Sequence, residues 1–274
     1  IRAWNTLFWV LLETTTRGKM LKKLFQQVIR FFARLFSSHS KPFEFPKGSK
    51  KPPIRPIIFV PGSSASIQRF NGTIRMLHRF SRKKQSLLKI KVNKDDSIEM
   101  EGRLNTKEPN PMIVIGFENN RDGYSNIKQQ IESLKIALTY LLDHYHFTEF
   151  KAVGHSNGGL VLTGLLESGF LEKKKVTVSK LAIIGSPYKF NQEMFDDFQK
   201  WKHRLEKEVE VLNFVGSFAG KSDGIVPLSS AQAAQSIFEK QAYTEVNLNG
   251  RKAHHSALPT NPDLVKQLSL FLNL

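Results

Sequence analysis

Residues 151–160 read KAVGHSNGGL, and this stretch decides the fold. An apolar run is followed at once by a serine between two glycines, Gly154 and Gly158, which fits the pattern G-x-S-x-G. Glycine is costly inside regular structure and useful where the backbone must turn sharply. In this pattern a strand turns abruptly into a helix, and the serine lies exposed on the turn. The stretch therefore predicts a buried strand, a sharp turn at Ser156 and a helix after it.

On both sides of this turn, short apolar runs alternate with helical stretches. The runs LLKIKVN and SIEMEG alternate apolar and polar residues on either side of a Lys-Asp-Asp turn, which is typical of a hairpin. Other strands are expected at 56–60, 112–117, 180–185, 209–216 and 242–248, and helices at about 124–144 and at the end of the chain. This alternation predicts an α/β domain with a mostly parallel central sheet and helices on both faces.

Two polar loops supply what a serine nucleophile needs. A serine hydroxyl attacks well only when a base takes its proton and a carboxylate orients that base. On such a sheet the acid follows the serine in the chain and the histidine comes last. Asp223 lies in GKSDGIVPLSS and His255 in RKAHHSALP, each in the loop after a predicted strand. Ser156, Asp223 and His255 are therefore the candidate catalytic residues. His254 is the alternative base.

The negative charge that develops on an attacked carbonyl oxygen needs hydrogen-bond donors. The backbone N–H of Asn157, directly after the candidate nucleophile, is expected to be one of them. The second is expected from the loop PGSSAS after the strand 56–60. We assign it to Ser63, or to Ser64 if the loop is shifted by one residue.

The segment 186–208 carries a stripe of aromatic residues and a methionine at near-helical spacing. It is either a cap over an acyl-binding pocket or a crossover helix packed on the sheet.

Elsewhere, the absence of cysteine excludes disulfides, thiol catalysis and a cysteine zinc site. No nucleotide-binding glycine loop is present, and His144-x-His146 is too little for zinc. No metal and no cofactor are expected.

The formal charge of +17 is concentrated at the N-terminus, where residues 1–55 carry +10. Within them, MLKKLFQQVIRFFARLF predicts a basic amphipathic helix at 20–36 that can lie on an anionic membrane surface. A helix packed on its own domain and a degenerate signal peptide are the alternatives. No recognition motif accompanies the charge, so no nucleic-acid partner is expected.

The composition shift divides the chain into a basic leader with a helix and a linker, 1–55, and a catalytic domain, 56–274. The chain begins with Ile1. It is therefore either a fragment, or it includes translated upstream sequence and the natural start is Met20.

Seven motifs occur in order over about residues 56–272: IIFVPGSSAS, KIKVNKDDSIEMEGRL, NPMIVIGFENN, FKAVGHSNGGL, IIGSPYKF, SDGIVPLSSA and HSALPTNPDLV. They resemble the α/β-hydrolase superfamily, and more closely a family of Gram-positive bacterial hydrolases of unknown function that are often labelled cell-surface hydrolases. The resemblance implies the α/β-hydrolase fold and a Ser156-Asp223-His255 triad, and its His-Ser step favours His255 over His254. Two features depart from the family: Pro61-Gly62 replaces the usual His-Gly, and the leader lacks a typical export signal.

Together these features predict a serine hydrolase that cleaves a carboxylic ester of a small or lipid-like molecule through an acyl-enzyme. Acyl transfer by the same triad is one alternative. A non-catalytic binding or surface-attachment protein on the same scaffold is another, against which the complete candidate triad argues. The predicted location is the membrane or cell surface of a Gram-positive bacterium, with the cytoplasm as the alternative.

Overall fold

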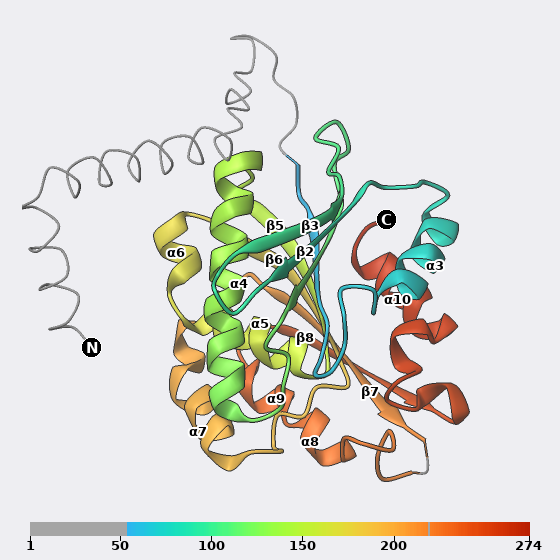
Figure 1. Cartoon of the computed structure of the whole chain (residues 1–274). Helices are drawn as coiled ribbons and strands as arrows, with labels where there is room; N and C mark the ends of the chain where they lie inside the picture. The colour runs from blue at the N-terminus through green and yellow to red at the C-terminus, as the bar shows by residue number, and fades with distance from the viewer. Residues whose placement is uncertain (1–53, 219) are drawn as a thin grey trace, which may run out of the picture. The chain divides into compact units, whose positions relative to one another are not determined.

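The computed structural model describes residues 54–218 and 220–274, which form an eight-stranded sheet with helices on both faces (Figure 1). The strands are β1 (Ile57–Val60), β2 (Leu87–Val92), β3 (Ile98–Gly102), β4 (Met112–Phe117), β5 (Glu149–His155), β6 (Thr177–Ile184), β7 (Glu210–Ser217) and β8 (Ala242–Asn249). Their order across the sheet is β3-β2-β4-β1-β5-β6-β7-β8. Neighbours are parallel except β2 and β3, which form the expected antiparallel hairpin. The mostly parallel sheet is confirmed.

The helices follow the predicted alternation. They are α3 (Asn71–Ser81), α4 (Tyr124–Tyr145), α5 (Asn157–Glu167), α6 (Phe170–Lys174), α7 (Gln192–Trp201), α8 (Leu228–Gln232), α9 (Ala234–Ile237) and α10 (Pro262–Phe271). Three short 3-10 turns are η1 (Lys202–Arg204), η2 (Arg251–Ala253) and η3 (Leu258–Thr260). In Figure 1, α3 and α10 lie on one side of the sheet, and α4, α6 and α7 lie on the other.

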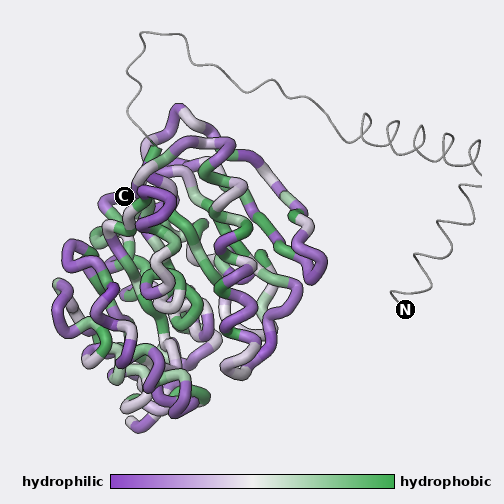
Figure 2. The backbone as a smooth tube through the Cα atoms, turned by 90° about the vertical axis from the view of Figure 1, so that its left-hand side faces the viewer, coloured by the Kyte–Doolittle hydropathy of each residue, from purple (hydrophilic) through white to green (hydrophobic). Residues whose placement is uncertain are grey.

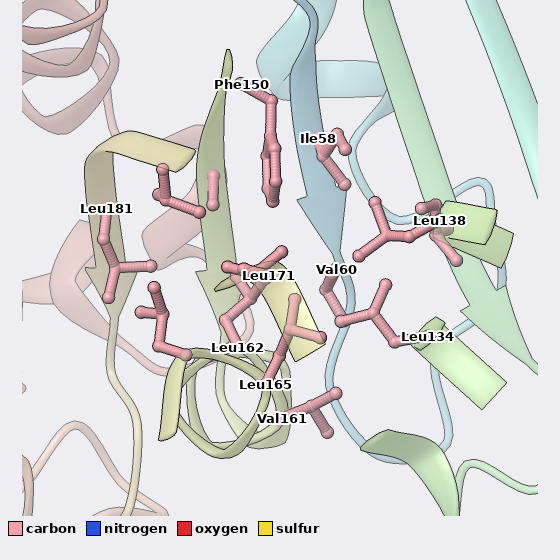
Figure 3. Packing of buried hydrophobic residues seen from close by; sticks show 14 of the residues in the cluster. Ile58, Val60, Leu134, Leu138, Phe150, Val161, Leu162, Leu165, Leu171 and Leu181 are labelled. Atoms are coloured by element: carbon pink, nitrogen blue, oxygen red, sulfur yellow. The ribbon is translucent and has the colours of Figure 1, made fainter. Parts of the chain in front are cut away.

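Two hydrophobic clusters fill the space between the sheet and its helices. Successive side chains of a strand point to opposite faces. In β1, therefore, Ile58 and Val60 join the cluster under α4 and α5, whereas Ile57 and Phe59 join the cluster under α3 and α10. Figure 3 shows Val60 close to Leu134 of α4 in the first of these clusters. The strands accordingly form a hydrophobic centre, with hydrophilic helix faces and loops outside it (Figure 2).

Helix α5 is the most deeply buried helix in the described part of the chain. From Asn157 to Glu167 only Gly164 is not fully buried, because the run LVLTGLL has no polar face. A helix that is apolar all round belongs in a protein's interior. Since Ser156 directly precedes α5, the residue is held at the end of a rigidly packed element.

The segment 186–208 combines both predicted interpretations. Helix α7 is a crossover helix, because Met194, Phe195 and Phe198 are buried in the cluster that it shares with α4 and α5. Before the helix, Phe190 is 68% exposed and contributes to the wall of a cavity. Only the start of the segment therefore borders a pocket.

The topology places one edge of the sheet where a ligand is expected. Strand β1 lies between β4 and β5, and the chain leaves it on one side and returns on the other. Ligands of open α/β sheets bind at such a switch point, beyond the carboxyl ends of the strands. The loops after β1 and β5, which carry Ser63 and Ser156, therefore lie next to each other.

Two further features concern membranes and the leader. Within the described residues, no helix combines the length and the hydrophobicity needed to cross a bilayer. The predicted amphipathic helix at 20–36 lies outside the described residues, and the boundary at residue 55 stays a prediction.

Candidate active site

Ser156 lies on the sharp turn between β5 and α5 with a backbone φ of +54° and ψ of −126°. A positive φ is uncommon for a residue with a side chain, and such strain persists only where the surrounding structure imposes it. Here the Ser156 amide donates a 2.9 Å hydrogen bond to the carbonyl of Ile184 in β6. The predicted strand, turn and helix are all present.

The glycines around Ser156 are required because the backbone comes unusually close to its neighbours. A Cβ atom at Gly158 would lie 2.0 Å from the Val60 carbonyl oxygen, and one at Gly154 would lie 2.5 Å from the Gly159 nitrogen. These glycines let α5 begin directly against β1 and its loop. Gly62, in that loop, meets the serine itself, since a Cβ there would lie 2.6 Å from the Ser156 Cβ.

Asp223 and His255 form a buried pair at the ends of β7 and β8. His255 Nδ1 lies 2.6 Å from Asp223 Oδ2, and the exposed fractions of the two residues are 6% and 1%. The other carboxylate oxygen, Oδ1, accepts hydrogen bonds from the amides of Ile225 (2.9 Å) and Val226 (2.7 Å). These bonds fix the carboxylate so that it accepts a hydrogen bond from Nδ1–H of His255, which leaves Nε2 as the basic nitrogen.

The structure distinguishes the two adjacent histidines. Among the described residues, His254 makes no hydrogen bond to Asp223: its ring packs edge-on against Phe218, and its Nδ1 accepts a 3.4 Å hydrogen bond from the Ser256 amide. Of the two, His255 is the one that meets the carboxylate and lines the same cavity as Ser156. The geometry thus favours the assignment that the sequence motifs had suggested.

Of the two candidate donor amides in the loop after β1, only one lacks an acceptor within the described part of the chain. The Ser64 amide donates to the Asn120 carbonyl at 2.9 Å and is therefore engaged. For the amide of Ser63, no acceptor is found among the described residues. Asn157 is the first residue of α5, so its amide has no intrahelical acceptor. Ser63 and Asn157 thus remain the candidate oxyanion donors.

His155, between Gly154 and Ser156, supports the histidine loop. Its Nε2 donates to the His255 carbonyl at 3.1 Å, and the two imidazole rings lie 4.8 Å apart. Burial, and then the charges of His255 and Arg69, hold the pKa of His155 well below its usual value. His155 is therefore a neutral donor that positions His255.

A cavity of about 780 Å³ joins these groups. Ser156, His255, Asn157 and Ser63 all line it. Its apolar wall is formed by residues of α4, α5, α7 and the loops near them: Tyr124, Ile127, Leu160, Pro187, Phe190, Met194, Ile225 and Val226. Apart from the candidate catalytic groups, polar side chains of the lining come from several loops: Ser63, Ser64, Arg69, Asp122, Asn191 and Ser256. The cavity thus places an apolar region beside the candidate nucleophile, the candidate base and the two candidate donor amides.

Ser156 and His255 share this cavity without a direct bond. Among the described residues, no hydrogen bond joins the Ser156 hydroxyl to the His255 ring. Such bonds are often long in enzymes without substrate and tighten in the substrate complex.

The cavity lining also includes residues that the sequence does not mark as functional, among them Arg69, Asp122 and Tyr124. Asp122 Oδ1 accepts a 2.9 Å hydrogen bond from the side-chain amide of Asn157. Tyr124 donates to Asp197 of α7 at 2.5 Å. Only Asp122 carried a local signal, since it comes shortly after the strand β4 at the switch point.

Comparison with known proteins relates the whole sheet-and-helix domain to a family of hydrolases. A family model described as "Alpha/beta hydrolase of unknown function (DUF915)" matches residues 45–273. A solved structure from Lactobacillus plantarum WCFS1, provisionally described as a cell surface hydrolase, is 37% identical, with a TM-score of 0.73. The match covers 80% of this chain and 92% of that one. The lin2722 gene product of Listeria innocua is 30% identical, with a TM-score of 0.71, over 80% of this chain and 94% of that chain. No curated protein matches the chain.

Proposed function

The chain belongs to the family of α/β hydrolases of unknown function, and on this premise we propose that it cleaves a carboxylic ester through an acyl-enzyme on Ser156. One observation carries the proposal. A serine on a strained, glycine-bounded turn opens into the same cavity as a buried His255–Asp223 pair. A binding protein has no use for this combination, whereas acyl chemistry requires every part of it.

In the first half of the reaction, His255 Nε2 takes the proton of the Ser156 hydroxyl as Oγ attacks the ester carbonyl. Asp223 holds the Nδ1–H and stabilises the imidazolium that forms. The oxygen of the tetrahedral intermediate accepts hydrogen bonds from the amides of Ser63 and Asn157. The C–O bond to the alcohol then breaks, and His255 returns the proton to the departing oxygen.

In the second half, water enters in place of the alcohol. His255 takes a proton from the water, whose oxygen attacks the acyl carbon, and the same amides hold the second oxyanion. The bond to Ser156 then breaks, the acid leaves and the serine regains its proton. The apolar wall of the cavity, with Leu160 and Met194, suits the hydrocarbon part of an acyl group.

We further propose that the protein acts at a bacterial membrane or cell surface. The description of the Lactobacillus plantarum relative and the basic sequence of residues 1–55 support this location. The predicted helix at 20–36 would contact anionic lipid. If a chain that begins at Ser37 sediments with anionic vesicles as well as the full chain does, this hypothesis fails.

Hydrolysis of p-nitrophenyl esters from acetate to palmitate tests the proposed reaction. Ser156→Ala should lower kcat by roughly 10³-fold or more, because the nucleophile is lost. The control is Ser133→Ala on α4, which does not line the cavity and should retain full activity. Equal activity of wild type and Ser156→Ala would exclude Ser156 as the nucleophile. If neither hydrolyses these esters, labelling of wild type but not of Ser156→Ala by a fluorophosphonate would still identify an activated serine.

A further inference from the structure

Arg69 is a cation inside the catalytic cavity. It precedes α3 and is half-buried, and it lines the same cavity as Ser156 and His255. Its Nη2 donates a 2.7 Å hydrogen bond to the carbonyl of Ser256, the residue after the candidate base. This bond holds the guanidinium beside the histidine loop.

No protein carboxylate neutralises this charge in the described part of the chain. Among the carboxylates of residues 54–218 and 220–274, none lies within 4.0 Å of the guanidinium nitrogens of Arg69. Asp122 lines the same cavity as Arg69, and Asp223 is paired with His255, but each of these carboxylates has other partners. Asp223 accepts from His255 and two backbone amides, and Asp122 accepts from the Asn157 side chain.

The cation is partly removed from water, and burial lowers the pKa of Arg69 from its ordinary value. A desolvated charge without a counter-ion is unfavourable, and an anion that binds beside it removes much of that cost. Arginine has five N–H donors in a planar fork, and Nη2 donates to Ser256. No other hydrogen bond of this side chain occurs among the described residues, so further donors can take a carboxylate or phosphate.

The apolar and cationic parts of the cavity come from different elements. The apolar lining is formed largely by α4, α5, α7 and the loop after Asp223, whereas Arg69 and Ser256 belong to the loop before α3 and the histidine loop. An ester bound with its carbonyl at Ser156 can therefore place hydrocarbon against one part and a charged group against the other.

We propose that Arg69 binds an anionic group of the substrate, so that the hydrolysed ester carries both an apolar acyl chain and a phosphate or carboxylate on its alcohol portion. This inference rests on the proposed hydrolysis at Ser156 and adds the class of substrate. Arg69 is thus a specificity-determining residue whose contact is the anion.

Three esters with the same acyl chain test the proposal: 1-butyryl-glycerol, 1-butyryl-glycerol 3-phosphate and 3-O-butyryl-glycerate, with the released acid measured. Wild type should prefer at least one anionic ester over the neutral one by about tenfold or more in kcat/KM. Arg69→Gln should abolish that preference, and Arg69→Lys should restore part of it. Whether the phosphate or the carboxylate ester is favoured identifies the anion.

Arg75→Gln on α3 is the matched control, because it removes the same charge from a residue that does not line the cavity. It should keep the wild-type preference. If Arg69→Gln slows all three esters equally, Arg69 only supports the histidine loop and the proposal is wrong. A wild-type enzyme that cleaves the neutral ester through Ser156 without any preference also overturns it, while the proposed function stands.

Binding gives a result that does not depend on turnover. The ether analogues 1-O-butyl-glycerol 3-phosphate and 3-O-butyl-glycerate cannot be cleaved at that position, and calorimetry reports their affinity directly. Wild type should bind at least one of them about tenfold or more tightly than Arg69→Gln does. Equal affinities of the two proteins for both analogues would overturn the anion site even if no ester is hydrolysed.

Discussion

His255 and Asp223 are joined twice: their side chains meet at 2.6 Å, and the His255 amide donates to the Asp223 carbonyl at 2.8 Å. The second bond ties the loop after β8 to the loop after β7 through the backbone, so the imidazole is aligned before any substrate binds. Gly216 and Gly185 pack against this pair, and a Cβ at Gly216 would lie 2.9 Å from the Asp223 Cβ. Asp223 and His255 therefore form one preorganised unit.

The two adjacent histidines give a sharp mutational contrast. His255→Ala should lower kcat for ester hydrolysis by roughly 10³-fold or more, because it removes the base beside Ser156. His254→Ala should change kcat by less than about threefold, since its ring contacts Phe218 and no catalytic atom. Steady-state kinetics of the two variants measure this, with circular dichroism to confirm folding. A comparable loss in both variants would contradict the assignment of His255.

A methyl group at Gly62 should impair catalysis more than folding. The new Cβ would lie 2.6 Å from the Ser156 Cβ and 2.9 Å from the His155 carbonyl, so the nucleophile must shift. Displacement of a reacting group by about 1 Å costs on the order of 10²-fold in rate. Gly62→Ala should therefore lower kcat by about 10²-fold, while the protein still unfolds in a cooperative thermal transition.

Gly72→Ala in α3 is the control for this substitution. Its Cβ would be crowded to a similar degree, at 2.7 Å, but by a methyl group of Thr260 that is not part of the cavity. Its kcat should stay at the wild-type value. An unchanged kcat in Gly62→Ala would show that the loop after β1 does not constrain Ser156.

Glu167 should make stability fall as pH rises. Burial, and then the charge of Asp197, raises its pKa from 4.5 to about 9, although the charge of Arg204 opposes the shift. Between these values the folded state keeps a proton that the unfolded state releases, so stability is fully present below about pH 4.5 and is lost towards about pH 9. Glu167→Gln removes this dependence.

Urea denaturation of wild type and Glu167→Gln at pH 5 and pH 9 measures the effect. At pH 9 the free energy of unfolding of Glu167→Gln should exceed that of wild type by about a few kcal/mol. This order of magnitude follows from the size of the pKa shift of Glu167. Glu172→Gln, an exposed site on α6, should leave the pH dependence unchanged. If the free energy of unfolding changes equally in wild type and Glu167→Gln between pH 5 and pH 9, the Glu167 carboxyl is ionised in the folded protein.

Sequence alone predicted most of what depends on local pattern or chain order. The glycines around Ser156 marked the turn because backbone contacts there forbid a side chain, and strand order placed Asp223 and His255 at one edge of the sheet. The choice between Ser63 and Ser64 depended on a hydrogen bond to Asn120, a residue distant in the sequence. No periodicity in the sequence could have shown that bond.

The remaining features arise from tertiary burial. Arg69 looks like an ordinary surface arginine in the sequence, and only the fold shows that it lines the cavity without a carboxylate partner among the described residues. Glu167 occurs at the end of a helix, where glutamate is common, and its raised pKa results from burial next to Asp197. Neither environment is encoded by neighbouring residues, so sequence patterns could not reveal it.

The division of the cavity between separate chain segments has an evolutionary consequence. Substitutions at Met194 or Ile127 can alter the accepted hydrocarbon without touching the loops that carry Arg69 and Ser256. Changes at sites that share no partners are close to additive. On the proposed function, descendants of one ancestral gene can therefore change acyl preference and alcohol preference one at a time, each step starting from a working enzyme.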